Sequence, residues 1–275
     1  GISPRQPNIP LEIGEKNFTI YADIASSAQK ILEELLFLIF EYAHKITNED
    51  KFLFSGGVAM NSSAVSKTAE LKFIKELNIP PSPGDSGAAI GAAYYGFIKN
   101  DTKSSNNSEE NKGIIDNLFP GQSKTNEDFF DLVFDKVADS QTSLEKVSKL
   151  IAENEIIATC YGNIETGPRA LGHRSLICNA HNEKLIKKLS TEIKKRNLFR
   201  PTAPVILREN AEKYFHLHKS LMNCYLHMAT IATPKKEFSN DIKGVVHADN
   251  SSRVQICEEN QLLGKILMNL NNELK

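Results

Sequence analysis

The stretch Gly162-Asn163-Ile164-Glu165-Thr166-Gly167-Pro168-Arg169-Ala170-Leu171-Gly172-His173-Arg174-Ser175 is the most informative part of the sequence. It follows the short apolar run 156–161, which predicts a buried strand. Arginines on a stiff loop punctuated by glycine suit bidentate capture of phosphate or carboxylate. The alternative is a loop whose arginines merely pair with surface acids. Two arginines among three glycines and a proline favour anion capture.

A second concentration of positive charge lies in the segment 184–200, which holds seven Lys and Arg residues. The whole chain is balanced, with Lys+Arg 33, Asp+Glu 34 and a net charge of -1, so a general polyanion binder is not expected and nucleic acid is a poor partner. A basic run is most often a solvated helix face. That interpretation suits Lys187 and Lys188, whereas Arg196 and Arg200, just before a proline, are expected to join the loop arginines.

Composition places the chain among globular proteins. Its 275 residues give room for two domains, and 40% hydrophobic with 24% charged residues exclude global disorder. The longest apolar run, 35–40, is too short to cross a bilayer, and no secretory signal is visible, so a cytoplasmic protein is expected. The cysteines lack paired spacing, which predicts four reduced, mostly buried thiols: Cys160, Cys178, Cys224 and Cys257.

Hydrophobic periodicity predicts two α/β units joined by a polar linker. In the first unit we expect a helix at 23–44 buried on most sides, strands at 51–54 and 73–77, and helices at 61–70 and 87–98. The segment 100–112 is almost entirely polar and predicts an exposed linker. In the second unit we expect helices at 127–134, 144–153, 184–195 and 261–270, and strands at 156–161, 245–246 and 253–256.

Two further motifs lie in the first unit. Gly56 and Gly57 join a predicted strand to a helix, where paired glycines let a backbone approach a phosphate. On these residues alone, nucleotide contact and a plain turn are equally favoured, and Asn61 suits a helix N-cap. Asp85, flanked by Gly84 and Ser86-Gly87, could bind metal or act as a base, but a helix cap is the favoured interpretation.

The segment 247–255 is expected to form a strand–turn–strand. His247, Asp249 and Arg253 could converge there on a substrate, and alone they would make an ordinary polar hairpin. His216 and His218 have no companion ligands nearby, so a metal role is not predicted for them.

These segments, in this order, resemble the O-carbamoyltransferase family of the NodU and CmcH type. The resemblance rests on Gly-Gly-Val-Ala-x-Asn at 56–61, Gly-Asp-x-Gly-x-x-x-Gly-Ala-Ala at 84–93, the loop at 162–175, Lys-x-Arg-x-x-Phe-Arg-Pro at 194–201 and His-x-Asp-x-x-x-Arg-Val-Gln at 247–255. It implies part of an actin-like ATPase (ASKHA) carbamoyl-transfer domain at 1–99, a linker at 100–116 and a YrdC-like α/β domain, C-terminally incomplete, at 117–275.

The resemblance also implies a reaction. The second domain would make carbamoyl-adenylate from carbamoyl phosphate and ATP, and the first would pass the carbamoyl group to the hydroxyl of a small acceptor. By this resemblance the catalytic residues are Arg169, Arg174, Arg196 and His247. Residues expected to bind substrate or nucleotide are Gly56, Gly57, Asn61, Gly167, Ser175, Lys194, Arg200 and Arg253. Asp85 would bind a divalent metal, expected to be iron.

Several departures shape the expectation. Family chains are much longer, and the His-x-x-x-His pair that completes the metal site is absent here, so this chain resembles the middle-to-C-terminal part of a carbamoyltransferase. An incomplete first domain should expose an open sheet edge or apolar face, or associate through it with another chain. The alternatives are a non-catalytic nucleotide-binding remnant or scaffold and a tRNA-modifying relative, which the near-neutral charge argues against.

Overall fold

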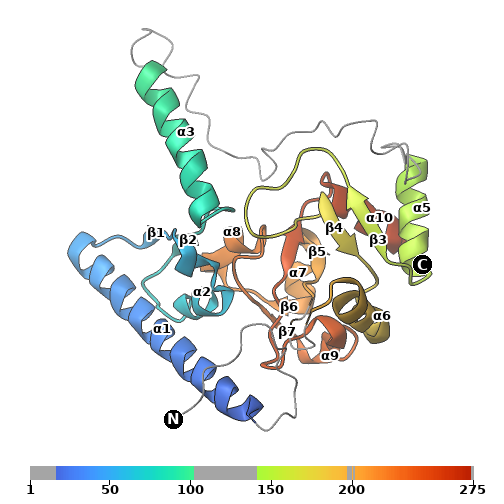
Figure 1. Cartoon of the computed structure of the whole chain (residues 1–275), viewed down its shortest axis with the longest axis horizontal. Helices are drawn as coiled ribbons and strands as arrows, with labels where there is room; N and C mark the ends of the chain where they lie inside the picture. Colours follow the sequence, from blue (N-terminus) through green and yellow to red (C-terminus); the bar gives the residue numbers. More distant parts are fainter. Residues whose placement is uncertain (1–16, 102–140, 197–199, 201, 274–275) are drawn as a thin grey trace.

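A computed structural model of the chain describes residues 17–101, 141–196, 200 and 202–273 (Figure 1). The predicted helix at 127–134 and the predicted linker from residue 102 onward lie outside these residues. In chain order the elements are α1 (Phe18–Thr47), β1 (Lys51–Leu53), α2 (Ser62–Thr68), β2 (Glu76–Asn78), α3 (Asp85–Asp101), α5 (Gln141–Ala152), β3 (Ile157–Cys160), β4 (Arg174–Ile177), α6 (Glu183–Lys188), β5 (Val205–Leu207), α7 (Arg208–Tyr214), β6 (Phe215–His216), α8 (Met222–Tyr225), β7 (Thr233–Pro234), α9 (Lys236–Ser239), β8 (Gln255–Cys257) and α10 (Leu262–Glu273). The mixture of helices and strands confirms the predicted α/β class.

Tight helical turns supplement these elements. Gly57–Met60, Lys219–Leu221 and Lys243–Val245 are single 3₁₀ turns, and Leu189–Ile193 continues α6 as a π-helical turn. The helix predicted at 184–195 is therefore confirmed as α6 and its π-helical continuation. The strand predicted at 245–246 is wrong, because Val245 ends a 3₁₀ turn.

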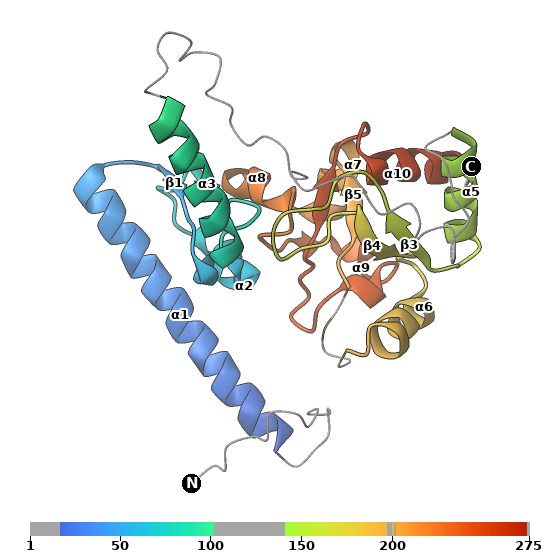
Figure 2. The ribbon, with the colours of Figure 1, turned by 45° about the horizontal axis from the view of Figure 1, so that its top comes forward.

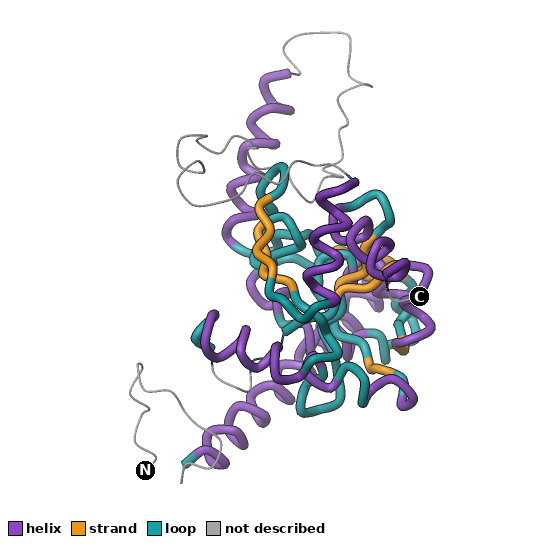
Figure 3. The backbone as a smooth tube through the Cα atoms, turned by 90° about the vertical axis from the view of Figure 1, so that its right-hand side faces the viewer, coloured by secondary structure: helices purple, strands orange, loops and turns teal. Residues whose placement is uncertain are grey.

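Within the described residues the strands form four two-stranded sheets, two parallel (β1–β2 and β5–β8) and two antiparallel (β3–β4 and β6–β7). Figure 3 shows how short the strands are beside the loops that join them. The predictions placed β2 about three residues and β8 about two residues too early. Strands β4 to β7 were not predicted, because strands of two to four residues carry too little alternation to be recognised.

Helix α1 lies along one edge of the molecule (Figure 2). Only Leu36 and Phe40 among its side chains are buried, so the prediction that this helix is buried on most sides is wrong. The large apolar side chains that it leaves exposed are Ile20, Ile24, Ile31, Leu35, Leu38, Ile39, Tyr42 and Ile46. The expected exposed apolar face is therefore present, and it arises because the remaining described elements cover only one side of the helix.

The main hydrophobic core joins the two predicted units. Phe40, Val65 and Leu77 from the first unit belong to the same cluster as Tyr225 and Ile256 from the second. Polar contacts run alongside: the Cys224 thiol donates to the carbonyl of Leu77 at 3.2 Å, and the Asn223 and Asn78 side chains bond at 2.8 Å. The two units thus share buried surface and do not pack as separate bodies.

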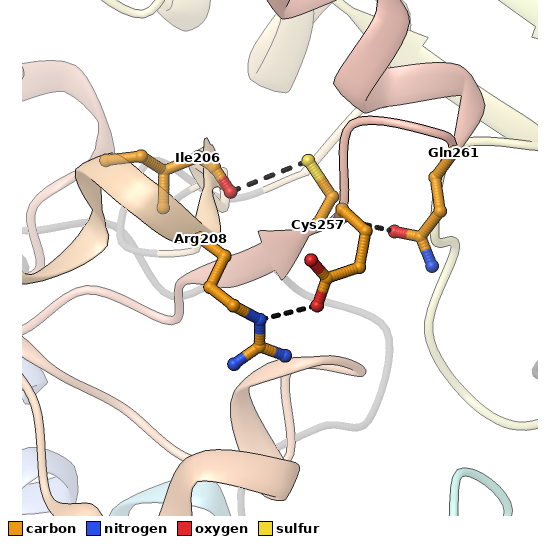
Figure 4. Close-up of polar contacts among 5 residues, drawn as sticks. Ile206, Arg208, Cys257 and Gln261 are labelled. Carbon is orange, nitrogen blue, oxygen red and sulfur yellow. Dashed lines mark hydrogen bonds and ion pairs between the residues drawn. The ribbon is translucent and has the colours of Figure 1, made fainter.

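A smaller core lies between α5, α10 and the β5–β8 pair. It contains Ile151, Leu207, Cys257, Leu263 and Ile266. Figure 4 shows the polar contacts at its rim: the Cys257 thiol points to the carbonyl of Ile206 at 3.5 Å, Arg208 pairs with Glu258, and the Glu258 N–H donates to Gln261 Oε1 at 3.0 Å. This core anchors α10 behind the sheet that carries the candidate site.

All four cysteines are unpaired, as predicted. Burial raises the pKa of the Cys257 thiol to about 12 and that of Cys224 to about 11, so these two thiols are inert near neutral pH. Only Cys224 and Cys257 are buried, whereas Cys178 is half-buried and Cys160 is exposed, so the expectation of a mostly buried set is met in part. Among the helices of the described residues, none combines the length and the apolar character needed to cross a bilayer.

Candidate functional site

A cleft of about 1280 Å³ opens beside β4 and β5. It is lined by the β3–β4 loop, the segment after α6, the start of β5, the 3₁₀ turn at 243–245 and the side chains that lead into β8. Eight of the predicted site residues line it: Arg169, Arg174, Ser175, Lys194, Arg196, Arg200, His247 and Arg253. Cationic side chains from three separate stretches of sequence therefore meet in one hollow, as the sequence predicted. What each of them binds stays a prediction.

Arg253 shows how strongly positive the cleft is. Burial, together with the like charges of Arg169, Arg196 and Arg200, lowers its pKa to about 10. Its Nε atom is buried and has no hydrogen-bond partner in the described structure. A buried donor without a partner costs free energy, and a guanidinium with an unused donor suits an anionic ligand.

Burial and like charges also lower the pKa of two neighbouring cations, Arg169 and Lys194. Burial, and then Arg200, lower the pKa of Arg169, while burial and Arg196 lower the pKa of Lys194. Within the described ranges none of these cations lies within 4.0 Å of a carboxylate, since the ion pairs there join Lys51–Glu76, Lys67–Glu70, Lys149–Glu153 and Arg208–Glu258. Positive charge that is not neutralised internally attracts phosphate groups.

The loop that presents Arg169 is organised by Glu165, a residue of the 162–175 motif that was not predicted to belong to the site. Its Oε1 accepts the backbone N–H groups of Leu171, His173 and Arg174 at 2.9, 2.7 and 2.9 Å. Burial raises the pKa of Glu165, but these backbone donors together outweigh burial and the net shift is downward. An acid among glycines just before a strand was the only signal that could have identified it.

We expect Glu165→Gln to lower the free energy of unfolding by about 1 kcal/mol at pH 7, because a neutral amide oxygen is a weaker acceptor and solvent screens the site in part. The folded-state pKa lies below the ordinary 4.5, so the carboxylate's contribution is present above that pH and is lost as pH falls through the folded value. Urea unfolding of both proteins from pH 7 to pH 3 should show the difference shrinking. A difference that is constant with pH would contradict this role.

Arg174 and Ser175 close the other end of the loop. The Arg174 guanidinium donates to the backbone carbonyls of Tyr161, Gly162 and His173 at 2.8, 3.1 and 3.0 Å. Ser175 Oγ accepts the N–H of Gly172 at 2.9 Å. These contacts give both side chains a structural role at the edge of the cleft, whereas contact with a substrate stays a prediction for each.

The two glycine motifs of the first unit meet at the carboxyl ends of the parallel strands β1 and β2. The N–H of Gly56 donates to the carbonyl of Pro83 at 2.7 Å, and Ser55 Oγ donates to the same carbonyl at 3.1 Å. Asn61 caps α2, as predicted, by accepting the Ala64 N–H at 3.1 Å. Its amide also pairs with Gln29, so this side chain is already used within the protein.

The loop that presents Arg169 also contacts the first unit. Arg169 donates to the carbonyl of Met60 at 3.2 Å. Gly167, with φ of 103°, packs against the backbone of Pro81, and a Cβ atom at this position would collide with the Pro81 carbonyl. Gly167 therefore lies at the junction of the two units and not in the cleft, and Gly56, Gly57, Asn61 and Asp85 also lie outside it.

Asp85 begins α3 and is exposed. In the part of the chain that the structure describes, no group of three or more His, Cys, Asp or Glu side chains could hold a metal ion. Asp85 alone does not make a metal site, and a metal bound there would need ligands from outside the described residues.

Two family descriptions match this sequence. Residues 148–274 match "Carbamoyltransferase C-terminus", which covers the cation-lined cleft, and residues 8–94 match "Carbamoyltransferase N-terminus". The chain belongs to the carbamoyltransferase family. Both halves of the carbamoyltransferase motif set therefore lie in one polypeptide, on either side of the segment 95–147.

Individual relatives agree with this assignment. An uncharacterized protein of Methanocaldococcus jannaschii is 30% identical over 261 residues, which cover 90% of this chain and 40% of the relative. Nodulation protein U of Sinorhizobium fredii is 28% identical, with 86% and 40% covered, and nodulation protein NolNO of the same organism is 25% identical, with 87% and 35% covered. This carbamoyltransferase chain spans less than half the length of these relatives.

Proposed function

We propose that this chain supplies the ATP- and carbamoyl phosphate-binding part of an O-carbamoyltransferase, which forms carbamoyl-adenylate and passes the carbamoyl group to an acceptor hydroxyl. The observation that carries the proposal is the convergence of Arg169, Lys194, Arg196, Arg200 and Arg253 in one cleft. Glu209 and Asp241 also line the cleft, but among the described residues no carboxylate lies within 4.0 Å of these cations. Carbamoyl phosphate and ATP are both polyanions, and holding them together requires cations that offset their repulsion.

The balance of the proposed first reaction is carbamoyl phosphate + ATP + H₂O → carbamoyl-adenylate + pyrophosphate + phosphate. Water first attacks carbamoyl phosphate, the bond between its carbamoyl group and its phosphate breaks, and carbamate and phosphate result. A carbamate oxygen then forms a bond to the α-phosphorus of ATP, and the bond from that phosphorus to pyrophosphate breaks. Negative charge develops on the leaving pyrophosphate, where the guanidinium groups of Arg196, Arg200 and Arg253 would stabilise it. Arg169 would hold the phosphate end closest to the first unit, because it also contacts Met60.

In the second reaction the acceptor hydroxyl attacks the carbamoyl carbon and AMP leaves. We assign this step to the first unit, as part of an actin-like (ASKHA) domain in which Gly56 and Gly57 would approach the adenylate, while the second unit would be YrdC-like. Space beside both glycines supports contact with a ligand, since a Cβ atom at either would meet no atom within 4 Å. The same proposal includes three further points. The acceptor is a small hydroxylated compound, the metal is an iron ion that uses Asp85 with ligands from elsewhere, and the location is cytoplasmic.

Isothermal titration of the chain with ATP and with carbamoyl phosphate tests the binding function. We expect both to bind, and Arg169→Ala and Arg196→Ala each to weaken binding at least about tenfold, since a lost charge-assisted contact is worth about 1.5–3 kcal/mol. Lys187→Ala is the matched control, because Lys187 is an exposed cation on α6 that does not line the cleft.

Two results would contradict the proposal: no binding of either ligand to folded protein, or unchanged binding in both arginine variants. The alternative is a non-catalytic nucleotide-binding module, for which ATP binds but no pyrophosphate is released when carbamoyl phosphate is added. Pyrophosphate release measured on the same protein distinguishes the two. Neither reading involves tRNA, and a filter-binding assay with tRNA should show no retention above that of the Arg196→Ala variant.

A further inference from the structure

The turn that carries His247 folds three polar side chains onto one another. The N–H of His247 donates to the carbonyl of Ser251 at 2.7 Å, and the N–H of Asn250, which has a φ of 61°, donates to the carbonyl of His247 at 3.0 Å. This tight turn places the Ser251 hydroxyl between Asp249 and the imidazole of His247. Ser251 is buried, with 6% of its surface exposed, so its hydroxyl must use these partners.

Counting protons assigns the direction of each bond. Ser251 Oγ lies 2.6 Å from Asp249 Oδ1 and 3.0 Å from His247 Nδ1. Burial raises the pKa of Asp249, but the hydrogen bonds from Ser251 and the nearby His247 outweigh burial and lower it, so this carboxyl is ionised and can only accept. The single hydroxyl proton of Ser251 therefore goes to Asp249, and the Ser251 oxygen accepts from His247 Nδ1–H.

The other imidazole nitrogen is left as an acceptor. Burial, and secondarily Arg253, lower the pKa of His247 although Asp249 opposes them, which keeps the ring neutral near pH 7. A neutral ring protonated at Nδ1 carries a lone pair at Nε2. Nε2 makes no hydrogen bond to the described residues, and the His247 side chain lines the cleft beside Arg253. A hydrogen-bond acceptor thus stands among donors that are positively charged.

We propose that Ser251 is a positioning residue that holds His247 in the Nδ1–H tautomer, so that Nε2 accepts a hydrogen bond from the amino group of carbamoyl phosphate. The inference rests on the proposed function. The cations of the cleft recognise a phosphate, and carbamoyl phosphate and acetyl phosphate carry the same phosphate. Only an acceptor distinguishes an NH₂ group from a methyl group, and a site built to bond an N–H rejects the analogue that lacks it.

The tautomer is measured directly by ¹⁵N NMR of the histidine rings of the folded chain, with the signal of His247 among the seven histidines identified by its loss in His247→Gln. We expect a protonated Nδ1 and an unprotonated Nε2 in the wild type and in Ser251→Thr. In Ser251→Ala the constraint is removed, and the protonated Nε2 form should appear. Ser27→Ala, an exposed serine on α1, is the control and should leave the signal unchanged.

A wild-type His247 protonated at Nε2, or a pattern unaffected by Ser251→Ala, would overturn the assignment, and the wild-type spectrum decides even if the variant does not fold. Recognition is tested by titrating carbamoyl phosphate and acetyl phosphate into each protein. We expect the wild type and Ser251→Thr to prefer carbamoyl phosphate at least about tenfold and Ser251→Ala to lose most of that preference. Equal preference in all three would overturn the recognition role, and binding of neither compound would instead contradict the proposed function while the tautomer result stands.

Discussion

Replacing Gly167 by alanine should lower the free energy of unfolding by about 3 kcal/mol. The backbone φ of 103° is strained for any residue with a Cβ atom, and that atom would collide with the carbonyl of Pro81. Neither side can yield cheaply, because both contacts are made by backbone. Since the collision lies at the junction of the two units, Arg169 should also shift from Met60, and ATP binding should weaken.

Urea unfolding measures the stability of the Gly167→Ala variant, and titration with ATP measures its binding. Gly91→Ala is the matched control, because a Cβ atom there meets no atom within 4 Å and the residue lies inside α3. Its stability should stay the same or rise by up to about 1 kcal/mol, as alanine favours a helix more than glycine does. A Gly167→Ala protein as stable as the wild type would show that the junction does not need this close approach.

Replacing Arg253 by methionine should move binding and stability in opposite directions. Binding of ATP should weaken at least about tenfold, because the most buried cation of the cleft is lost. The free protein should gain about 1 kcal/mol, since methionine fills similar space without a buried unpartnered Nε or repulsion from Arg169, Arg196 and Arg200. Opposite effects on binding and on stability are expected where like charges that repel one another in the free protein are needed to bind the ligand.

Arg208→Met is the control for that variant. Arg208 pairs with Glu258 on the surface beside β5 and does not line the cleft, so its loss should cost no more than about 1 kcal/mol and leave ATP binding unchanged. Thermal unfolding with and without ATP reports both effects, because a bound ligand stabilises the protein in proportion to its occupancy. If Arg253→Met both weakened the fold and retained ATP binding, the charge argument for this cleft would be wrong.

The residues of the candidate site that could be predicted from sequence are cations in segments where a charged side chain is uncommon. Arg169 and Arg253 could be singled out because a cation among glycines, or in a motif with His247, has little structural use. Glu165 and Ser251 were not assigned, because an acid or a serine in a loop is common and only their partners reveal a role. Those partners are backbone N–H groups and a ring nitrogen, which no residue pattern specifies.

The same distinction separates the elements of the fold. Helices α6 and α10 were predicted because their apolar residues recur with a 3.6-residue period over several turns of sequence. The pairing of β5 with β8 was not, since each strand is three residues long and their register depends on contacts across about fifty residues of chain. For α1 the predicted helix is confirmed and the predicted burial is wrong. Periodicity identifies the apolar side of a helix, but it does not say whether another element covers that side.

The sequence by itself determined the α/β class, the carbamoyltransferase motifs and the set of cations, because these depend on residue type and local spacing. The tertiary structure alone decided that those cations share one cleft, that Gly167 packs closely against the other unit and that Asp85 stands without companion ligands among the described residues. The physical reason is that electrostatic coupling and close packing depend on distance in space. The contacts concerned join segments far apart along the chain, as between Arg169 and Met60, which are 109 residues apart.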